Sequence, residues 1–115
     1  MSNRETFRAP VVQGTLDLMV LQTLDSLGPS HGYAIAARLD QVSKGALQLN
    51  MGTLYPALMR LEQRRLIRGK WGLSDRNRKA RFYGLTLAGR RALAKEAQAW
   101  DRMAGIIHTL LRGDA

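Results

Sequence analysis

The 115-residue sequence contains no cysteine and only two histidines. A disulfide framework, a catalytic thiolate and any zinc or iron–sulfur site with cysteine ligands are therefore excluded. His31 and His108 lie far apart in the chain, and neither has neighbours that complete a metal site, so we predict no metal and no cofactor. The carboxylates are dispersed singly, without the grouping that phosphodiester hydrolysis needs, and we predict that the protein is not an enzyme.

Long apolar runs are also missing. The longest candidates, Leu18–Leu24 and Met103–Leu111, fall far short of the roughly 20 residues that a membrane span requires. Met1–Pro10 lacks the apolar region of a signal peptide. We therefore expect a single-domain cytoplasmic protein with no membrane partner.

Positive charge is concentrated in one part of the chain. The net charge is +9, from 18 Lys and Arg against 9 Asp and Glu. Residues 1–59 are neutral in sum, whereas residues 60–81 carry nine basic and two acidic side chains, a net +7. Such a concentrated patch is typical of a polyanion-binding surface, the alternative being charge that serves only to hydrate the surface.

Apolar periodicity predicts three helices in the first half of the chain. The first spans residues 14–27 with Gly14–Thr15 as its N-cap, and the second runs from about residue 30 to 43. The third begins near Gly52 or Thr53, because Pro56 is tolerated best in a first helical turn. A short strand is predicted at Leu47–Leu49. The predicted inward positions are Leu16, Val20, Leu24, Leu27, Ile35, Leu39, Val42, Leu54, Leu58 and Leu61.

A hairpin and a long helix follow. Strands are predicted at 66–71 and 81–85 around a basic, turn-rich loop, and Thr86 is the predicted cap of a helix that reaches about Leu111. This order defines a mainly α fold with a small β-hairpin, a winged helix-turn-helix followed by a long C-terminal dimerisation helix. The predicted parts are a flexible segment 1–13, a DNA-binding domain 14–85 and a dimerisation helix 86–112.

Three motifs resemble those of the PadR family of bacterial transcriptional regulators. They are GPSHGY at 28–33, GTLYPALMRLE at 52–62 and RFYGLTLAGR at 81–90, and the resemblance extends over residues 14–112. It implies a winged helix that binds palindromic double-stranded operator DNA, C-terminal helices that form a homodimer, and, as for many members, repression. The single C-terminal helix resembles the shorter members. The alternative is a winged-helix module that binds a protein and no DNA.

The candidate DNA contacts lie on the third helix and on the wing, because a recognition helix presents its first residues to base edges while the wing follows phosphates. They are Tyr33, Asn50, Thr53, Tyr55, Arg60, Arg76, Arg78, Lys79 and Arg81. The alternatives stay open: core packing for Tyr33 and Tyr55, and a carboxylate partner for Arg60, such as Asp40 or one near Glu62. We expect Trp71 and Phe82 to cover the domain's own core, and His31 to cap a helix.

The last helix carries an apolar seam at alternating spacings of four and three. The seam residues are Leu93, Ala97, Trp100, Ala104, Ile107 and Leu111, flanked by Met103, Ile106 and Leu110. We interpret the seam as a dimer interface, the alternative being packing along the first helix. The resemblance also implies an aromatic small-molecule effector, for which Trp100 is the candidate ligand residue, although we favour interface packing for this side chain.

Overall fold

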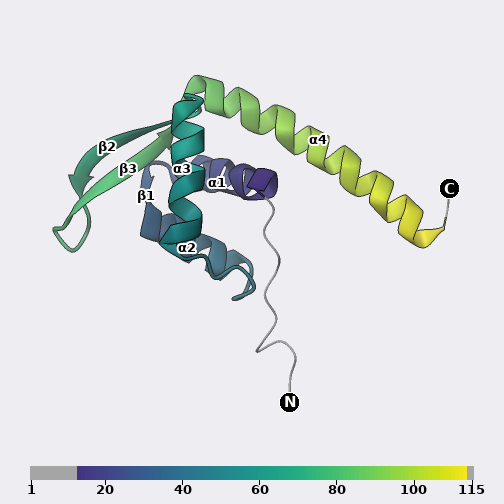
Figure 1. The fold of residues 1–115 in the computed structure, drawn as a ribbon, viewed down its shortest axis with the longest axis horizontal. Coiled ribbons are helices and arrows are strands. Elements are labelled where there is room, and N and C mark those ends of the chain that lie inside the picture. The colour runs from purple at the N-terminus through teal and green to yellow at the C-terminus, as the bar shows by residue number, and fades with distance from the viewer. Residues whose placement is uncertain (1–12, 114–115) are drawn as a thin grey trace, which may run out of the picture.

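The computed structural model describes residues 13–113, so the predicted N-terminal segment lies outside the described residues except for Gln13. The elements are α1 (Gln13–Leu27), β1 (Ser30–His31), α2 (Gly32–Val42), α3 (Met51–Gln63), β2 (Ile67–Leu73), β3 (Lys79–Leu85) and α4 (Leu87–Arg112). The first three helices form a cluster, from which the β2–β3 hairpin projects on one side and α4 on the other (Figure 1). The winged helix-turn-helix with a long C-terminal helix is confirmed.

The core lies where the inner faces of α1, α2 and α3 meet. Eight of the predicted inward positions are buried, and they are Leu16, Val20, Leu24, Ile35, Leu39, Leu54, Leu58 and Leu61. Leu27 and Val42 are 45% and 63% exposed, so their predicted burial was wrong. Each is the last residue of its helix, beyond the stretch that the neighbouring helices cover.

The β2–β3 hairpin and β1 together form a three-stranded antiparallel sheet in the order β1-β3-β2. Ser30 and His31 pair with Tyr83 and Phe82 of β3. The strand predicted at Leu47–Leu49 was wrong, because residues 47–50 form an irregular connection. Leu47 and Leu49 are partly buried, so the alternation of apolar and polar residues here reflects side-chain contact with the core and not pairing with another strand.

Three helices begin at side-chain caps. Nδ1 of His31 accepts a hydrogen bond from the Ala34 N–H at 3.2 Å, which confirms the capping role predicted for this histidine. Oδ1 of Asn50 accepts from the Thr53 N–H at 2.9 Å, and Oγ1 of Thr86 accepts from the Gly89 N–H at 2.9 Å, the latter as predicted.

Two predicted helix starts need correction. Because Asn50 is the cap, α3 begins at Met51, and Pro56 lies in its second turn rather than its first. Gly52 and Pro56 are both exposed, so the carbonyl that lacks a helical donor faces solvent. The predicted cap at Gly14–Thr15 was wrong as well, since α1 already includes Gln13.

The base of α4 is fixed to the connection between α3 and β2. Oγ1 of Thr86 donates to the carbonyl oxygens of Arg65 at 2.8 Å and Leu66 at 3.1 Å, and the Thr86 N–H also donates to Leu66 at 3.1 Å. Gly89 is buried against the same Leu66 carbonyl, where a Cβ would overlap the oxygen. Leu93, the first residue of the predicted seam, belongs to the domain's own core at 8% exposure.

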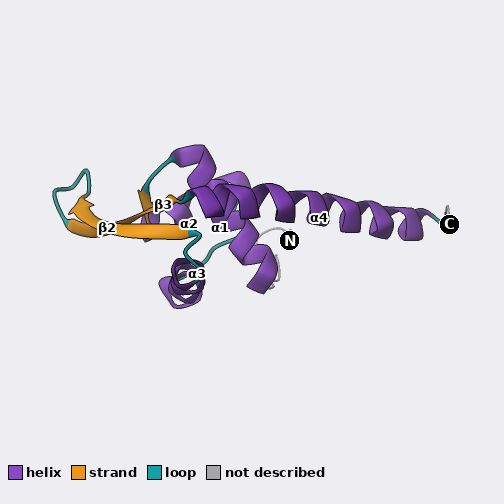
Figure 2. Ribbon diagram, turned by 90° about the horizontal axis from the view of Figure 1, so that it is seen from above, coloured by secondary structure: helices purple, strands orange, loops and turns teal. Residues whose placement is uncertain are grey.

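Beyond this base, α4 extends away from the other helices as a long rod (Figure 2). None of the helices within residues 13–113 combines the length and the apolar character needed to cross a membrane. The same residues bring together no group of three or more metal-binding side chains.

Candidate nucleic-acid interface

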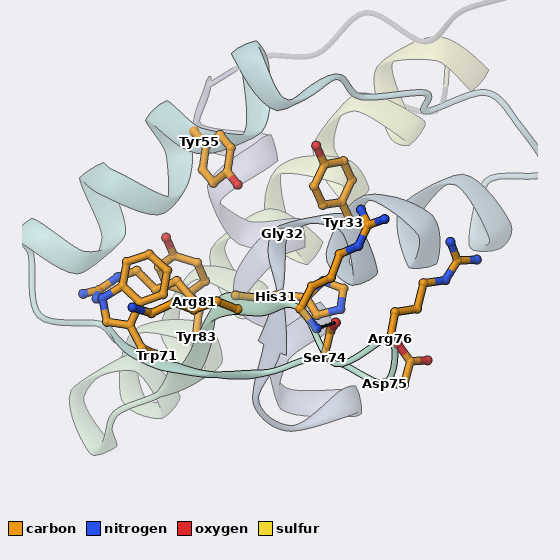
Figure 3. A pocket seen from close by; sticks show the side chains of 13 residues that line it. His31, Gly32, Tyr33, Tyr55, Trp71, Ser74, Asp75, Arg76, Arg81 and Tyr83 are labelled. Carbon is orange, nitrogen blue, oxygen red and sulfur yellow. Dashed lines mark hydrogen bonds between the residues drawn. The ribbon is translucent and has the colours of Figure 1, made fainter.

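A cleft of about 580 Å³ lies between the hairpin and the N-terminal parts of α2 and α3. We call β2, β3 and the connecting residues 74–78 the wing. The cleft lies between the wing, the start of α2 and the first turns of α3, and it is open to solvent (Figure 3). Its lining residues are His31, Gly32, Tyr33, Tyr55, Trp71, Ser74, Asp75, Arg76, Arg78, Lys79, Ala80, Arg81 and Tyr83.

The tip of the wing is a tight turn. The Asn77 N–H donates to the carbonyl of Ser74 at 2.8 Å, and the Ser74 N–H donates to the carbonyl of Arg78 at 2.8 Å. Asn77 adopts a φ of +59°, a left-handed conformation that asparagine tolerates better than most residues. The turn therefore presents Arg76 and Arg78 from a fixed backbone.

Three of the four predicted wing cations have no acidic partner within the part of the chain that the structure describes. Among residues 13–113, no carboxylate lies in salt-bridge distance of Arg76, Arg78 or Lys79. The Nζ of Lys79 lies 5.4 Å from the centre of the Trp71 ring, a cation–π distance. These three cations leave the cleft with a net positive charge, because Asp75 at the tip offsets only part of it.

Arg81 differs from the other wing cations. Its Nη2 lies 2.7 Å from Oε2 of Glu62, and this hydrogen bond raises the pKa of Arg81 above its usual value. Tyr83, directly behind it in the cleft, is buried, and this burial raises the pKa of its hydroxyl. The predicted DNA contact Arg81 is thus already ion-paired in the protein.

Two tyrosines line the helical side of the cleft (Figure 3). Tyr33 at the start of α2 is 68% exposed, so the alternative of core packing does not apply to it. Tyr55 is 43% exposed, and its ring lies beside Gly32, whose added Cβ would be 3.7 Å from Cε1. Both phenols can donate a hydrogen bond to an anionic oxygen.

The remaining predicted contacts on α3 lie outside the cleft lining. Asn50 and Thr53 are exposed at the N-terminal end of the helix, where Asn50 also serves as the cap. Arg60 lies further along α3 and is paired with a carboxylate, as the alternative held. The partner is Asp17 in α1, whose Oδ1 lies 2.8 Å from Nη2 of Arg60, and not Asp40 or a residue near Glu62. Asp17 is buried, so the pair joins α1 to α3 in a largely desolvated contact.

Trp71 is the cleft residue that sequence reasoning misplaced. We expected it to cover the core, yet it is 64% exposed on the cleft side of the wing. Phe82, on the other side of the hairpin, is half-buried with its ring 5.4 Å from that of His31. The strand register could have separated them, because Trp71 pairs with Arg81 and therefore shares a face with the cations.

Beyond Leu93 the seam of α4 is apolar and largely exposed in the structure of residues 13–113. Trp100, Ile107 and Leu111 are 52%, 48% and 80% exposed, whereas Ala97 and Ala104 are partly buried. The flanking Met103, Ile106 and Leu110 are exposed too. A hollow of about 220 Å³ on this face is lined by Trp100, Met103, Ala104, Ile107 and His108.

A helix-turn-helix whose third helix and basic wing enclose an open, positively charged cleft defines a winged-helix DNA-binding protein. The chain belongs to the PadR-like transcriptional regulator family, which it matches over residues 20–95. It is therefore a DNA-binding transcription regulator, as the resemblance of the three motifs implied.

Individual relatives agree with this assignment. The fold is similar to that of a PadR-like transcriptional regulator from Bacillus cereus, with 26% identity, a TM-score of 0.73, and coverage of 86% of this chain and 93% of the other. A transcriptional regulator from Clostridium thermocellum is 24% identical, with a TM-score of 0.77 and coverage of 88% and 97%, which supports the fold alone.

A sequence relative is an uncharacterized 37.1 kDa protein in a transposon of Streptomyces fradiae, 45% identical over 78 residues. The match covers 68% of this chain and 21% of that protein, so the matched segment spans about one fifth of the relative's length.

Proposed function

We propose that the protein is a homodimeric repressor that binds a palindromic operator in the cytoplasm, where its DNA target lies. The observation that carries the proposal is the cleft between α3 and the wing, along one wall of which lie three cations without a carboxylate partner among residues 13–113. One sugar-phosphate strand lying in this cleft would have Arg76, Arg78 and Lys79 on one side and the phenols of Tyr33 and Tyr55 on the other.

With a DNA strand placed in the cleft in this way, the N-terminal end of α3 enters the major groove. Asn50 and Thr53 are the exposed side chains there and are proposed to face base edges. We do not assign Arg60 to DNA, because its guanidinium is held by Asp17. Specificity therefore depends on the first turn of α3, and affinity depends mainly on the wing.

The homodimer is supported by the exposed seam of α4. Contiguous exposed apolar side chains on a single helix are typical of an interaction surface, and the four-three spacing is that of helix-on-helix packing. A two-fold axis through the seam would relate two recognition helices and match a palindromic operator. A dimer bound over a promoter represses by occlusion, which requires no further activity.

The proposed effector would occupy the same face. The hollow beside Trp100 measures about 220 Å³, below the roughly 300 Å³ at which small-molecule pockets begin. A single chain thus supplies only part of such a site, and an aromatic ligand would need the second copy to enclose it. We propose that the partner's apolar side chains fill the hollow in the unliganded dimer.

Fluorescence anisotropy of labelled upstream DNA against a shuffled duplex, over a range of salt, tests the proposal. We expect about 1,000-fold tighter binding to the operator fragment and a steep fall of log affinity with log salt. Arg78→Ala should make that slope shallower by about 0.9 for each half-site, whereas Arg91→Ala, which removes the same charge from exposed α4 surface, should not. Absence of binding at low salt would refute DNA binding and favour a protein partner.

A further inference from the structure

One carboxylate connects α3 to both strands of the wing. Glu62 lies in the last turn of α3, and its Oε2 accepts hydrogen bonds from Nη2 of Arg81 in β3 at 2.7 Å and from the Gly69 N–H in β2 at 3.1 Å. Both side chains of the ion pair are about one-third exposed. The contact is therefore accessible to solvent, and it reaches the cleft through Arg81, which lines it.

Glycine at position 69 makes room for this contact. The guanidinium of Arg81 lies across the strand over Gly69, where an added Cβ would overlap Nε and lie 2.8 Å from Cζ. The same guanidinium is 5.8 Å from the Trp71 ring centre and 5.9 Å from that of Tyr83. Arg81 is thus fixed between two rings, a backbone surface and a carboxylate.

This placement changes what Arg81 can contribute to binding. A guanidinium paired with Glu62 adds little net charge to the cleft, unlike Arg76, Arg78 and Lys79. The guanidinium of Arg81 packs against the ring of Trp71, and the same ring contacts the Nζ of Lys79 on the cleft wall. The pair therefore connects the end of α3, through Arg81 and Trp71, to the wall of the cleft.

We propose that Glu62 is a positioning residue for DNA binding, which acts through Arg81 and the Gly69 N–H to hold the wing at the distance from α3 that a DNA strand requires. The inference rests on the DNA binding proposed above and adds a role to a residue that carries the same negative charge as DNA. It also reassigns Arg81 from a phosphate contact to the support of the wing.

Glu62→Ala distinguishes positioning from simple electrostatics, because the two predict opposite changes in DNA affinity. If charge alone mattered, removal of a carboxylate would tighten binding, and the released Arg81 would steepen the salt dependence by about 0.9 for each half-site. Positioning instead requires that binding weaken by roughly threefold to tenfold, the factor that a lost hydrogen bond supplies, with no steeper salt dependence.

The assay is DNA anisotropy with the full chain over a range of salt. Arg81→Met and the double variant complete a cycle in which positioning predicts that both single variants and the double variant lose affinity to a similar extent. If Arg81 instead contacts phosphate directly, Arg81→Met alone should weaken binding with a shallower salt slope while Glu62→Ala tightens it. That pattern would overturn the inference.

A spectroscopic measurement distinguishes a displaced wing from a domain that is merely less stable. In a Trp100→Phe background the emission of Trp71 reports its cation contacts, and it should shift in Glu62→Ala at temperatures well below the unfolding midpoint. If Glu62→Ala does not fold, Arg81→Met carries the test through its salt slope. A wild type that fails to bind DNA would refute the proposed function, whereas normal wild-type binding with unchanged or tighter binding by Glu62→Ala would refute only this inference.

Discussion

Alanine at position 89 should destabilise the protein although alanine favours helices. In a helix interior, Gly→Ala adds up to about 1 kcal/mol of stability. Here the new Cβ overlaps the Leu66 carbonyl oxygen and lies 3.0 Å from its carbon and 3.2 Å from Cδ2 of Leu85. The first turn of α4 must therefore move away from residues 65 and 66.

The size of the loss follows from the bonds that this movement stretches. The Leu66 oxygen accepts from the N–H and from Oγ1 of Thr86, both at 3.1 Å. Two hydrogen bonds are worth about 0.5–1.5 kcal/mol each, and overpacking costs about 1–3 kcal/mol. After the gain in helix propensity of up to about 1 kcal/mol is subtracted, we expect Gly89→Ala to lower the free energy of unfolding by about 3 kcal/mol.

Urea unfolding followed by circular dichroism measures this difference, with every variant at the same protein concentration because a dimer's stability depends on it. Gly105→Ala is the matched control, since it lies on the same helix and a Cβ there has open space around it. The control should gain about 0.5–1 kcal/mol. A Gly89→Ala protein as stable as the wild type would refute the tight attachment of α4.

Three further outcomes are expected. Asp17→Asn should lower the free energy of unfolding by about 1–2 kcal/mol in urea titrations, because it leaves the guanidinium of Arg60 without its buried partner; an equal loss in an Arg60→Met background would disprove the coupling. Ile107→Glu should convert the dimer into a monomer in analytical ultracentrifugation, and a dimeric variant would exclude the α4 seam as the interface. Burial raises the pKa of Tyr83, so the unfolded chain releases this proton first and stability should fall as the pH rises above about 10. Tyr83→Phe should show a shallower fall, and an identical pH profile would contradict it.

Local signals in the sequence predicted the local features of the fold. Thr86 precedes a long apolar-periodic run and caps α4, and the hydrophobic stripe of α3 is buried as its spacing indicated. The two-residue strand β1 carries no periodic pattern of its own, because it exists only through pairing with Tyr83 and Phe82. Propensity therefore could not distinguish it from the alternation at Leu47–Leu49.

The ion pairs show why the site was harder to predict than the fold. Arg60 was expected either on DNA or on a nearby carboxylate, but its partner Asp17 is 43 residues away in the chain. Arg81 and Glu62 come from different elements and meet because Gly69 leaves space between them. Such partners depend on how helices and strands pack, which one-dimensional periodicity does not encode.

The fixed base of α4 has an evolutionary consequence. A helix that is attached rigidly to the DNA-binding domain at Thr86 and Gly89 would transmit every insertion further along it directly to the proposed dimer interface. One added residue would rotate the seam by about 100° and disrupt it, whereas seven would return it to nearly the same face about 10 Å further out. Homologues built on this plan should therefore change the separation of their half-sites in heptad steps, so that the length of α4 records the spacing of the operator.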